Sequence, residues 1–357
     1  MRVCILGSSI SSLSLAKALV NLKINVDVLS AKKPNFVNRS RTIGISKSNV
    51  DFFNKNVINI EKIIWKINEI DIYSDKLEGQ KLINFKNKND YLFSIIKNYK
   101  LQEILEKSLK KNKYFRLLKY NKKINYEQDY ALVFNTDYNN SFTKKFFYKK
   151  IEKKYNSFAY TTILKHKKIS NKVAIQIFTK NGPLAFLPLS DYETSIVYSI
   201  NSQLKKTDEI KTFINSYNFK YDYVKINKID CFELKGLNLR SYYHKNILAF
   251  GDLLHRIHPL AGQGFNMTIR DIKNLINIIK KKIELGLSID SSINKEFEKS
   301  QKHKNLLFTS GINFIHEFFN LERKTKNEFL SKSIQFLNKN LTVNKIFKKI
   351  ADEGKLF

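Results

Sequence analysis

The sequence is poor in the residues that build disulfide frameworks, tight turns and membrane spans. Its 357 residues include two cysteines, four prolines, one tryptophan and eleven glycines. Cys4 and Cys231 can form neither a disulfide framework nor a cysteine-rich metal cluster, and such sparse use of cysteine is typical of a reducing compartment. No apolar run approaches the roughly 20 residues that cross a bilayer. The first residues lack a basic segment followed by a cleavage site, so we expect no signal peptide.

Acidic residues are also scarce, since 32 Asp and Glu face 64 Lys and Arg and leave a net charge of +32. A nucleic-acid-binding protein concentrates such charge in one patch or stripe. Here lysine is spread through nearly every segment together with Asn and Ile, all of which AT-rich codons encode, so we expect no nucleic-acid partner. The apolar fraction of 43% is typical of a globular protein with one large domain or two interlocked ones.

Residues 251–266 form the most informative stretch of the chain. A short apolar segment at 246–250 predicts a buried strand before it, and helical spacing predicts a helix at 265–285 after it, which Gly286 ends. Asp252 follows the strand and can accept hydrogen bonds from sugar-like hydroxyls. Gly262 and Gly264 lack a Cβ atom, so backbone N–H groups can approach a ligand closely. A helix start nearby favours negative charge, and the stretch therefore suits a flat, anionic ligand.

The N-terminal residues predict a strand, a helix and a second strand. This βαβ order is the architecture that places the pyrophosphate of a dinucleotide at the first turn. The glycine positions of the G-x-G-x-x-G fingerprint are filled by Gly7, Ser9 and Ser12. Ser30 stands where an acidic residue would bind ribose. Taken alone, the segment therefore indicates a generic Rossmann-like unit.

Two motifs carry a family resemblance. Residues 251–266 read GD-x-x-H-x-x-HP-x-x-GQG-x-N, and residues 174–199 read A-x-Q-x-F, GP-x-A-x-LPL and S-x-V-Y-S in turn. These motifs resemble the p-hydroxybenzoate-hydroxylase-like FAD-dependent monooxygenases, in the branch that hydroxylates the aromatic ring of ubiquinone precursors. The resemblance covers roughly residues 1–345.

The resemblance implies an α/β fold: a Rossmann-like FAD-binding domain with an inserted mixed or antiparallel β-sheet substrate domain and C-terminal helices. The implied FAD-binding domain is discontinuous and comprises residues 1–60, 97–155 and 240–300. The implied substrate domain comprises residues 61–96 and 156–239, and a C-terminal helical region comprises residues 301–357.

The resemblance also implies site residues. In the family, the position of Asp252 binds the ribityl chain of FAD, and the loop at 259–264 lies along the isoalloxazine ring. The expected cofactor-binding residues are Gly7, Ser9, Ser12, Arg41, Gln102, Asp137, Gly251, Asp252, Pro259, Ala261, Gly262, Gln263, Gly264 and Asn266. The expected substrate-pocket residues are Gly182, Pro183, Phe186, Pro188 and His258. No metal ligand and no catalytic side chain is expected, because the flavin carries the chemistry.

Some of these positions also fit a plainer interpretation. Arg41 and Gln102 are equally compatible with solvated surface side chains. Asp137 is retained where the family has a Gly-Ala-Asp-Gly turn, but Asn135 and Tyr138 replace its glycines. His255 and His258 are spaced like a metal pair, yet no third ligand is evident, so we assign them to loop structure.

The activity implied is hydroxylation of a polyprenyl-phenol, with NAD(P)H as the reductant of FAD and O2 reacting through a flavin hydroperoxide. The alternative is a catalytically eroded flavin-fold scaffold for other ubiquinone-biosynthesis proteins, suggested by the substituted first turn. A flavin reductase acting on isoprenoid chains is a third interpretation. We expect a cytoplasmic protein, with peripheral contact at the inner face of the cell membrane because of its basic charge and apolar substrate class.

Overall fold

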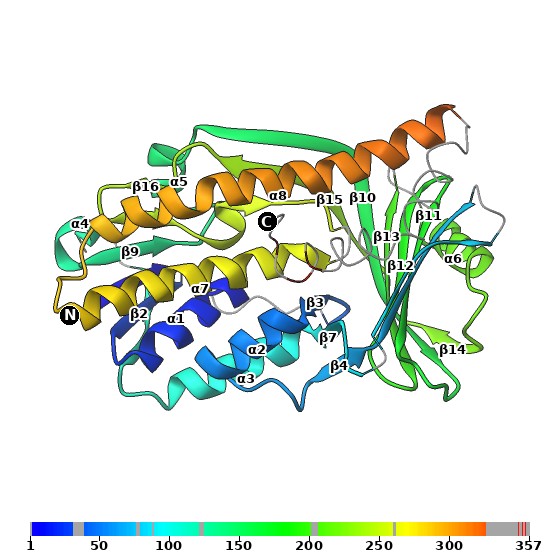
Figure 1. Cartoon of the computed structure of the whole chain (residues 1–357), viewed down its shortest axis with the longest axis horizontal. Helices are drawn as coiled ribbons and strands as arrows, with labels where there is room; N and C mark the ends of the chain where they lie inside the picture. The colour runs from blue at the N-terminus through cyan, green and yellow to red at the C-terminus, as the bar shows by residue number, and fades with distance from the viewer. Residues whose placement is uncertain are drawn as a thin grey trace.

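The computed structural model describes residues 2–30, 39–75, 79–87, 89–120, 125–200, 206–259 and 262–325, together with 349, 352 and 354. Figure 1 shows two halves side by side: a parallel sheet with its helices, and a large, mostly antiparallel sheet. The fold agrees with the α/β architecture expected from the sequence. In the described ranges, no helix has an apolar stretch long enough to cross a membrane.

The parallel sheet is ordered β16-β17-β9-β1-β2-β8, and only the β16–β17 pair is antiparallel. Val3 to Leu6 are buried without alternation, as is typical of a parallel strand covered on both faces. Helices α1 and α3 pack against each other beside this sheet. The elements of this half are β1 (Arg2–Leu6), α1 (Ile10–Asn21), β2 (Asn25–Ser30), α3 (Asn98–Lys110), β8 (Phe115–Lys119), α4 (Tyr126–Asp129), β9 (Leu132–Asn135), α5 (Ser141–Phe146), β16 (Tyr243–His244) and β17 (Ile247–Ala249).

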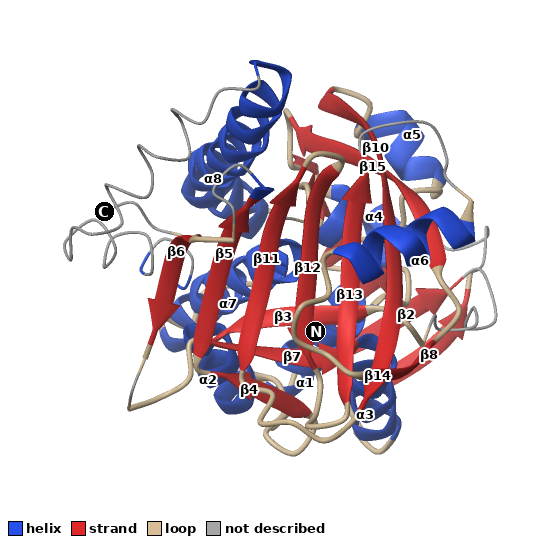
Figure 2. Cartoon of the chain, turned by 90° about the vertical axis from the view of Figure 1, so that its right-hand side faces the viewer, coloured by secondary structure: helices blue, strands red, loops and turns tan. Residues whose placement is uncertain are grey.

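The large sheet is ordered β18-β15-β10-β13-β12-β11-β5-β6, with β14 paired to β10. Figure 2 shows this sheet with α6 in front of it. We call the face under α6 the outer face and the face turned to the parallel sheet the inner face. Its elements are β5 (Glu69–Ser74), β6 (Lys81–Lys86), β10 (Lys150–His166), β11 (Val173–Thr179), β12 (Gly182–Pro188), β13 (Glu193–Ile200), α6 (Thr207–Ser216), β14 (Tyr223–Ile226), β15 (Asp230–Leu239) and β18 (His255–Arg256).

A small antiparallel sheet lies between the two halves. It pairs β7 (Phe93–Lys97) with both β3 (Thr42–Ser46) and β4 (Ile64–Ile67). The sequence had placed residues 61–96 together in the substrate sheet, but only β5 and β6 of that range join it. Because strand pairing depends on partners distant in sequence, the local pattern could not separate these two destinations.

Three further helices complete the architecture: α2 (Lys47–Asn56), α7 (Gln263–Glu284) and α8 (Ser292–Thr325). The long α8 runs beside α7 and extends from the parallel-sheet half to the large sheet (Figure 1). It begins before the boundary at residue 300 that the sequence had suggested. This one helix therefore packs on both halves.

Candidate functional site

The candidate site lies at the carboxyl edge of the parallel sheet, where β1, β9 and β17 end side by side. Open α/β sheets bind ligands at this edge because several loops and helix starts meet there. Gly7 follows β1 with φ of +106°. A Cβ atom on Gly7 would lie 2.5 Å from Oγ1 of Thr136, the residue that follows β9. The glycine therefore lets the first turn pack directly on the neighbouring strand.

A network of serines closes the start of α1. Ser9 Oγ accepts a hydrogen bond from the Ser12 N–H at 3.3 Å, and the Ser9 N–H donates to Ser12 Oγ at 3.2 Å. This is a reciprocal capping box. Ser12 is fully buried, and its hydroxyl lies 2.6 Å from that of Thr136. Ser8 and Ser30 hydroxyls are 3.1 Å apart. Ser9 and Ser12, which replace glycines of the fingerprint, thus cap the start of α1.

Gly251 and Asp252 follow β17 in the short 3-10 helix η2 (Gly251–Leu253). Gly251 has φ of +64°, and a Cβ atom there would lie 2.9 Å from Cβ of Ser11 in the first turn of α1. Its lack of a side chain lets the strand end approach the helix start. Asp252 is exposed although Leu253 and Leu254 beside it are buried. The carboxylate is therefore held at the surface of the edge where a ligand would lie.

The start of α7 has no side-chain cap. Its N-cap residue is Gly262, in the left-handed region with φ of 62°. The first N–H groups of a helix lack intrahelical partners and attract anions or polarised oxygens. A Cβ atom on Gly264 would meet no atom within 4 Å. This helix start therefore faces open space at Gly264, and the ring-binding role expected for residues 259–264 stays a prediction. Ala261 lies outside the described residues.

Asn266 differs from its expected role as a cofactor ligand. It is fully buried, and its amide makes four hydrogen bonds within the protein. Its oxygen accepts from the Ser46 N–H and the Asn49 amide, both at 2.9 Å. Its nitrogen donates to the carbonyls of Gly44 at 3.0 Å and Gly262 at 3.2 Å. These bonds use its full capacity, so Asn266 fastens the loop to β3 instead of contacting a ligand.

Residues 39–46 lie against the inner face of the large sheet. The Ser40 hydroxyl donates to the Asp230 carboxylate at 2.7 Å, and the hydroxyls of Thr42 and Ser195 are 2.8 Å apart. The exposed Arg41 stacks over Phe232, with 4.6 Å between its guanidinium carbon and the ring centroid. The segment therefore joins the two halves, and Arg41 lies at this junction.

The expected substrate residues divide between the two faces of the large sheet. Phe186 is buried with Ile210 and Ile214 of α6, on the outer face. Side chains alternate along a strand, so Pro188 shares the outer face with Phe186, and Pro183 lies on the inner face. The geometry therefore corrects the expectation for Phe186 and Pro188, which point away from the candidate site. Gly182 is at the hairpin, where a Cβ atom would lie 2.0 Å from the Ser199 carbonyl oxygen.

His258 belongs to a buried cluster of rings. Its centroid is 5.0 Å from that of Tyr155 and 4.5 Å from that of His316 in α8. Tyr155 donates to Asn313 at 2.7 Å, and burial raises the pKa of this phenol to about 12. His258 thus ties the loop before α7 to α8, which the sequence did not predict.

His255 also has a structural partner. Its Nε2 lies 2.5 Å from the Asp271 carboxylate, and both side chains are buried. Both histidines thus have structural partners. In the described ranges, no group of three or more His, Cys, Asp or Glu side chains could hold a metal ion. Asp271 lies sixteen residues after His255, and the apolar pattern of α7 gave the only signal that its side chain points inward.

The other expected residues are engaged locally. The Gln102 amide donates to Glu106 at 2.8 Å, one turn later in α3. Asp137 accepts from the Asn139 N–H at 2.9 Å in the turn after β9. Pro259 is half-buried and Gln263 is buried at the start of α7. Of this group, Asp137 and Pro259 lie in loops at the candidate site, and Gln263 is the first residue of α7.

Comparison with known proteins agrees with this arrangement. A family model described as FAD binding domain matches residues 202–284. The mitochondrial ubiquinone biosynthesis monooxygenase COQ6 of Schizosaccharomyces pombe is 26% identical over 198 residues, covering 42% of this chain and 41% of that protein. The 3-demethoxyubiquinol 3-hydroxylase of Escherichia coli is 28% identical over 152 residues, covering 40% and 39%. Over the matched residues, the chain is similar to FAD-dependent hydroxylases of ubiquinone biosynthesis.

The solved structures extend the likeness in fold to nearly the whole chain. The p-nitrophenol 4-monooxygenase PnpA of Pseudomonas putida superposes with a TM-score of 0.80 at 12% identity, covering 97% of this chain and 96% of that one. This likeness establishes the fold. The matched sequence spans about two fifths of the curated relatives' length, 41% and 39% in the two proteins named.

Proposed function

We propose that the protein is an FAD-dependent monooxygenase that uses NAD(P)H and O2 to hydroxylate the aromatic ring of a polyprenyl-phenol in ubiquinone biosynthesis. The similarity to COQ6 and to 3-demethoxyubiquinol 3-hydroxylase supports this proposal. The observation that carries it is the uncapped start of α7, which faces open space at Gly264. Exposed Asp252 lies at the same sheet edge. It follows β17, which is two strands away from β1 and its first turn in the sheet order.

These residues fit FAD. Asp252 would accept hydrogen bonds from the hydroxyls of the ribityl chain. The first N–H groups of α7 would stabilise negative charge on the ring, because they have no side-chain cap. At the other end, the pyrophosphate would lie at the start of α1, where the Ile10 and Ser11 N–H groups are outside the capping box of Ser9 and Ser12. FAD, when bound, supplies hydride acceptance and O2 activation.

An apolar cluster offers a surface for an apolar substrate. Phe178 of β11 packs with Leu82, Ile257 and Met267 between the large sheet and α7. Pro183 is paired opposite Phe178 and shares its face of the sheet. This cluster adjoins the loop before α7, so a phenol held here would be shielded from water beside the flavin ring. The chain's own role is to bind and orient the substrate and the cofactor and to exclude water.

The deciding experiment measures flavin in the purified protein. We expect about one FAD per chain, seen in the absorbance spectrum and after acid release, and tighter binding than in Asp252→Ala. A matched variant, Glu284→Ala, changes one exposed carboxylate at the far end of α7 and should bind FAD normally. Failure to bind FAD even with excess cofactor would overturn the proposal.

The activity test uses the flavin-loaded protein with NADH or NADPH and a prenylated phenol. We expect substrate-dependent NAD(P)H oxidation and a product heavier by one oxygen atom, with the label retained when 18O2 is used. Reductant oxidation that yields only hydrogen peroxide would contradict hydroxylation of that substrate.

The hydrogen bonds of the first turn favour the alternative function, a scaffold that does not bind FAD. The first-turn serines bond to one another, and Ser30 bonds to Ser8 where a ribose-binding acid is expected. A scaffold would associate with other ubiquinone-biosynthesis proteins and bind no FAD. The flavin measurement therefore separates the two functions.

We also propose peripheral contact with a membrane. Leu307, Phe314 and Leu321 are 59%, 69% and 55% exposed and recur every seven residues along α8. That spacing aligns them along one side of the helix, and the excess of lysine favours anionic lipid headgroups. Flotation with vesicles containing anionic lipid tests this contact. Absence of binding at low ionic strength would exclude it.

A further inference from the structure

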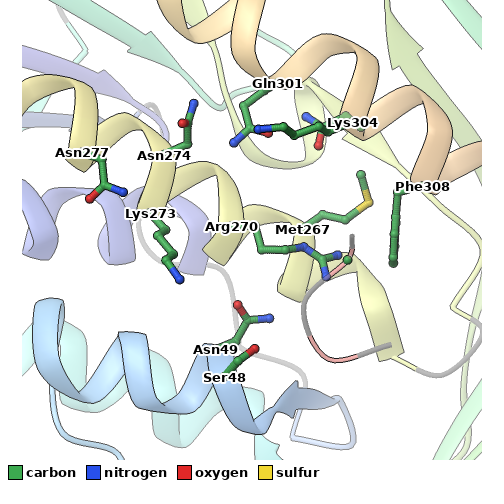
Figure 3. Close-up of a pocket in the computed structure, with 12 residues that line it drawn as sticks. Ser48, Asn49, Met267, Arg270, Lys273, Asn274, Asn277, Gln301, Lys304 and Phe308 are labelled. Atoms are coloured by element: carbon green, nitrogen blue, oxygen red, sulfur yellow. The ribbon is translucent and has the colours of Figure 1, made fainter. Parts of the chain in front are cut away.

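A cavity lies between α2, α7 and α8, away from the loop that precedes α7 (Figure 3). Its volume is about 460 Å³, within the range of small-molecule sites. Arg270, Lys273 and Lys304 line it together with amide side chains such as Asn274. None of the described residues that line it is acidic. The cavity therefore has a concentrated positive charge and many hydrogen-bond donors.

Arg270 is the most unusual of these residues. Both terminal guanidinium nitrogens, Nη1 and Nη2, are buried and have no hydrogen-bond partner in the described structure. Figure 3 shows the side chain reaching toward Phe308 of α8, and the guanidinium carbon lies 4.4 Å from that ring's centroid. Burial lowers the pKa of Arg270 to about 10, so the group remains charged at neutral pH. A buried charge without an acceptor is unfavourable unless a partner binds.

Two carboxylates of the chain lie near Arg270, but neither accepts a hydrogen bond from its guanidinium nitrogens Nη1 and Nη2. Asp271 is engaged with His255 and Asn305. Asp352 accepts from the Ser48 N–H at 2.9 Å, at the start of α2. Gly354 packs closely on the guanidinium, since a Cβ atom there would lie 2.3 Å from Nη1. Gly354 thus lines one side of the cavity, and none of these groups accepts a hydrogen bond from Nη1 or Nη2 of Arg270.

We propose that this cavity is a binding site for a small phosphate-bearing anion, with two phosphate oxygens accepting hydrogen bonds from Nη1 and Nη2 of Arg270. Guanidinium pairs with phosphate in this bidentate geometry. Lys273 and Lys304 also line the cavity, are exposed and contribute positive charge. Arg270 is seven residues after Gln263, or roughly 10 Å along the helix from the start of α7, and the proposal does not rest on the proposed function.

The test measures anion-dependent stability of the full chain. Thermal unfolding is followed with increasing inorganic phosphate or pyrophosphate, with sodium chloride at matched ionic strength. We expect a rise in Tm that grows with ligand concentration, since a ligand of the folded state stabilises it. Arg270→Gln should lose this rise. Lys281→Gln removes one exposed charge from the same helix outside the cavity and should keep it.

Each outcome decides the proposal. An equal rise in wild type and Arg270→Gln would show general screening of the +32 charge and overturn the site, as would no rise in wild type. If Arg270→Gln does not fold, Lys304→Gln provides a second test, because it changes an exposed side chain. This variant should bind pyrophosphate several-fold more weakly when the affinity is measured by calorimetry. Unchanged affinity would overturn the site. A rise with NADP+ but not NAD+ that needs Arg270 assigns the phosphate to a nucleotide; a rise with inorganic anions alone assigns a free anion.

Discussion

Asn266 offers the sharpest test of how the flavin-side loop is held. Its amide connects β3, α2 and the start of α7 through four hydrogen bonds, and the residue is fully buried. Asn266→Ala removes all four bonds at once. The Gly44 and Gly262 carbonyls and the Ser46 N–H would be left in the interior without this partner. The backbone that positions the loop would then lose its attachment.

The expected loss follows from the number of bonds. Each net hydrogen bond contributes roughly 1 kcal/mol, and buried groups left unpaired cost more. We therefore expect Asn266→Ala to lower the free energy of unfolding by about 4 kcal/mol, a large part of the ~5–15 kcal/mol typical of a protein. Asn266→Asp keeps the two accepted bonds but faces two carbonyls with a carboxylate. Its deficit should shrink when acid protonates that carboxyl group and restores a donor.

Denaturant unfolding, followed by circular dichroism with and without added FAD, measures these values. Asn274→Ala is the matched control, because Asn274 lies on the same helix, is half-buried and makes one side-chain bond, to Ser300 at 2.6 Å. The control should lose about 1 kcal/mol. FAD should also bind Asn266→Ala at least several-fold more weakly. A loss no larger than that of the control would refute the role assigned to Asn266.

Three further predictions concern other parts of the chain. Ser9→Gly should lower the free energy of unfolding by only a few tenths of a kcal/mol, and Ser9→Ala should lower it by about 1 kcal/mol. Ser9→Gly should also bind FAD more tightly in a fluorescence titration; weaker binding would show that the hydroxyl assists the cofactor. Hydrogen bonds from Ser292, the first residue of α8, lower the pKa of Asp290 to about 2 from 3.8. The stabilisation by Asp290 is therefore complete above pH 3.8 and is lost as pH falls through 2. Asp290→Ala should therefore cost about 1 kcal/mol in denaturant unfolding at pH 7 and little near pH 2; an equal cost at both would contradict this. Burial raises the pKa of the Cys4 thiol, and Cys231 is exposed, so a thiol reagent should label one cysteine in the native protein and two in denaturant; rapid labelling of both would contradict the burial of Cys4.

Regular elements with a long repeating pattern could be predicted from the sequence. Helix α7 was expected at 265–285 and extends from Gln263 to Glu284. Its apolar residues recur at helical spacing, and Gly286 follows with φ of +65°, as a helix end requires. The first βαβ unit could also be predicted, because its first strand is a short apolar run and a helix with an apolar face follows it. In both cases the decisive interactions are local in sequence.

Side-chain direction and long-range partners could not be predicted in the same way. Phe186 and Pro188 share a motif with Pro183 but point to the opposite face, because strand side chains alternate and register sets the face. Asn266 lies in a cofactor-binding motif, yet three of its four side-chain bonds are made to residues 217 to 222 positions away in sequence. Arg270 and Asp271 are adjacent charges on a helix, and only tertiary packing buries both of them.

The two helix starts at the sheet edge differ in a way that bears on cofactor binding. The start of α1 is capped by its own serines, whereas the start of α7 has no side-chain cap and faces open space. At α1 the capping box already uses the Ser9 and Ser12 N–H groups and leaves those of Ile10 and Ser11, while at α7 no side chain caps the N-terminus of the helix. More of the binding free energy should therefore arise at the ring end than at the pyrophosphate end. On this reasoning, flavin mononucleotide should retain a larger share of the affinity for FAD here than in a protein with an intact glycine turn, and a comparison of the two Kd values measures that share.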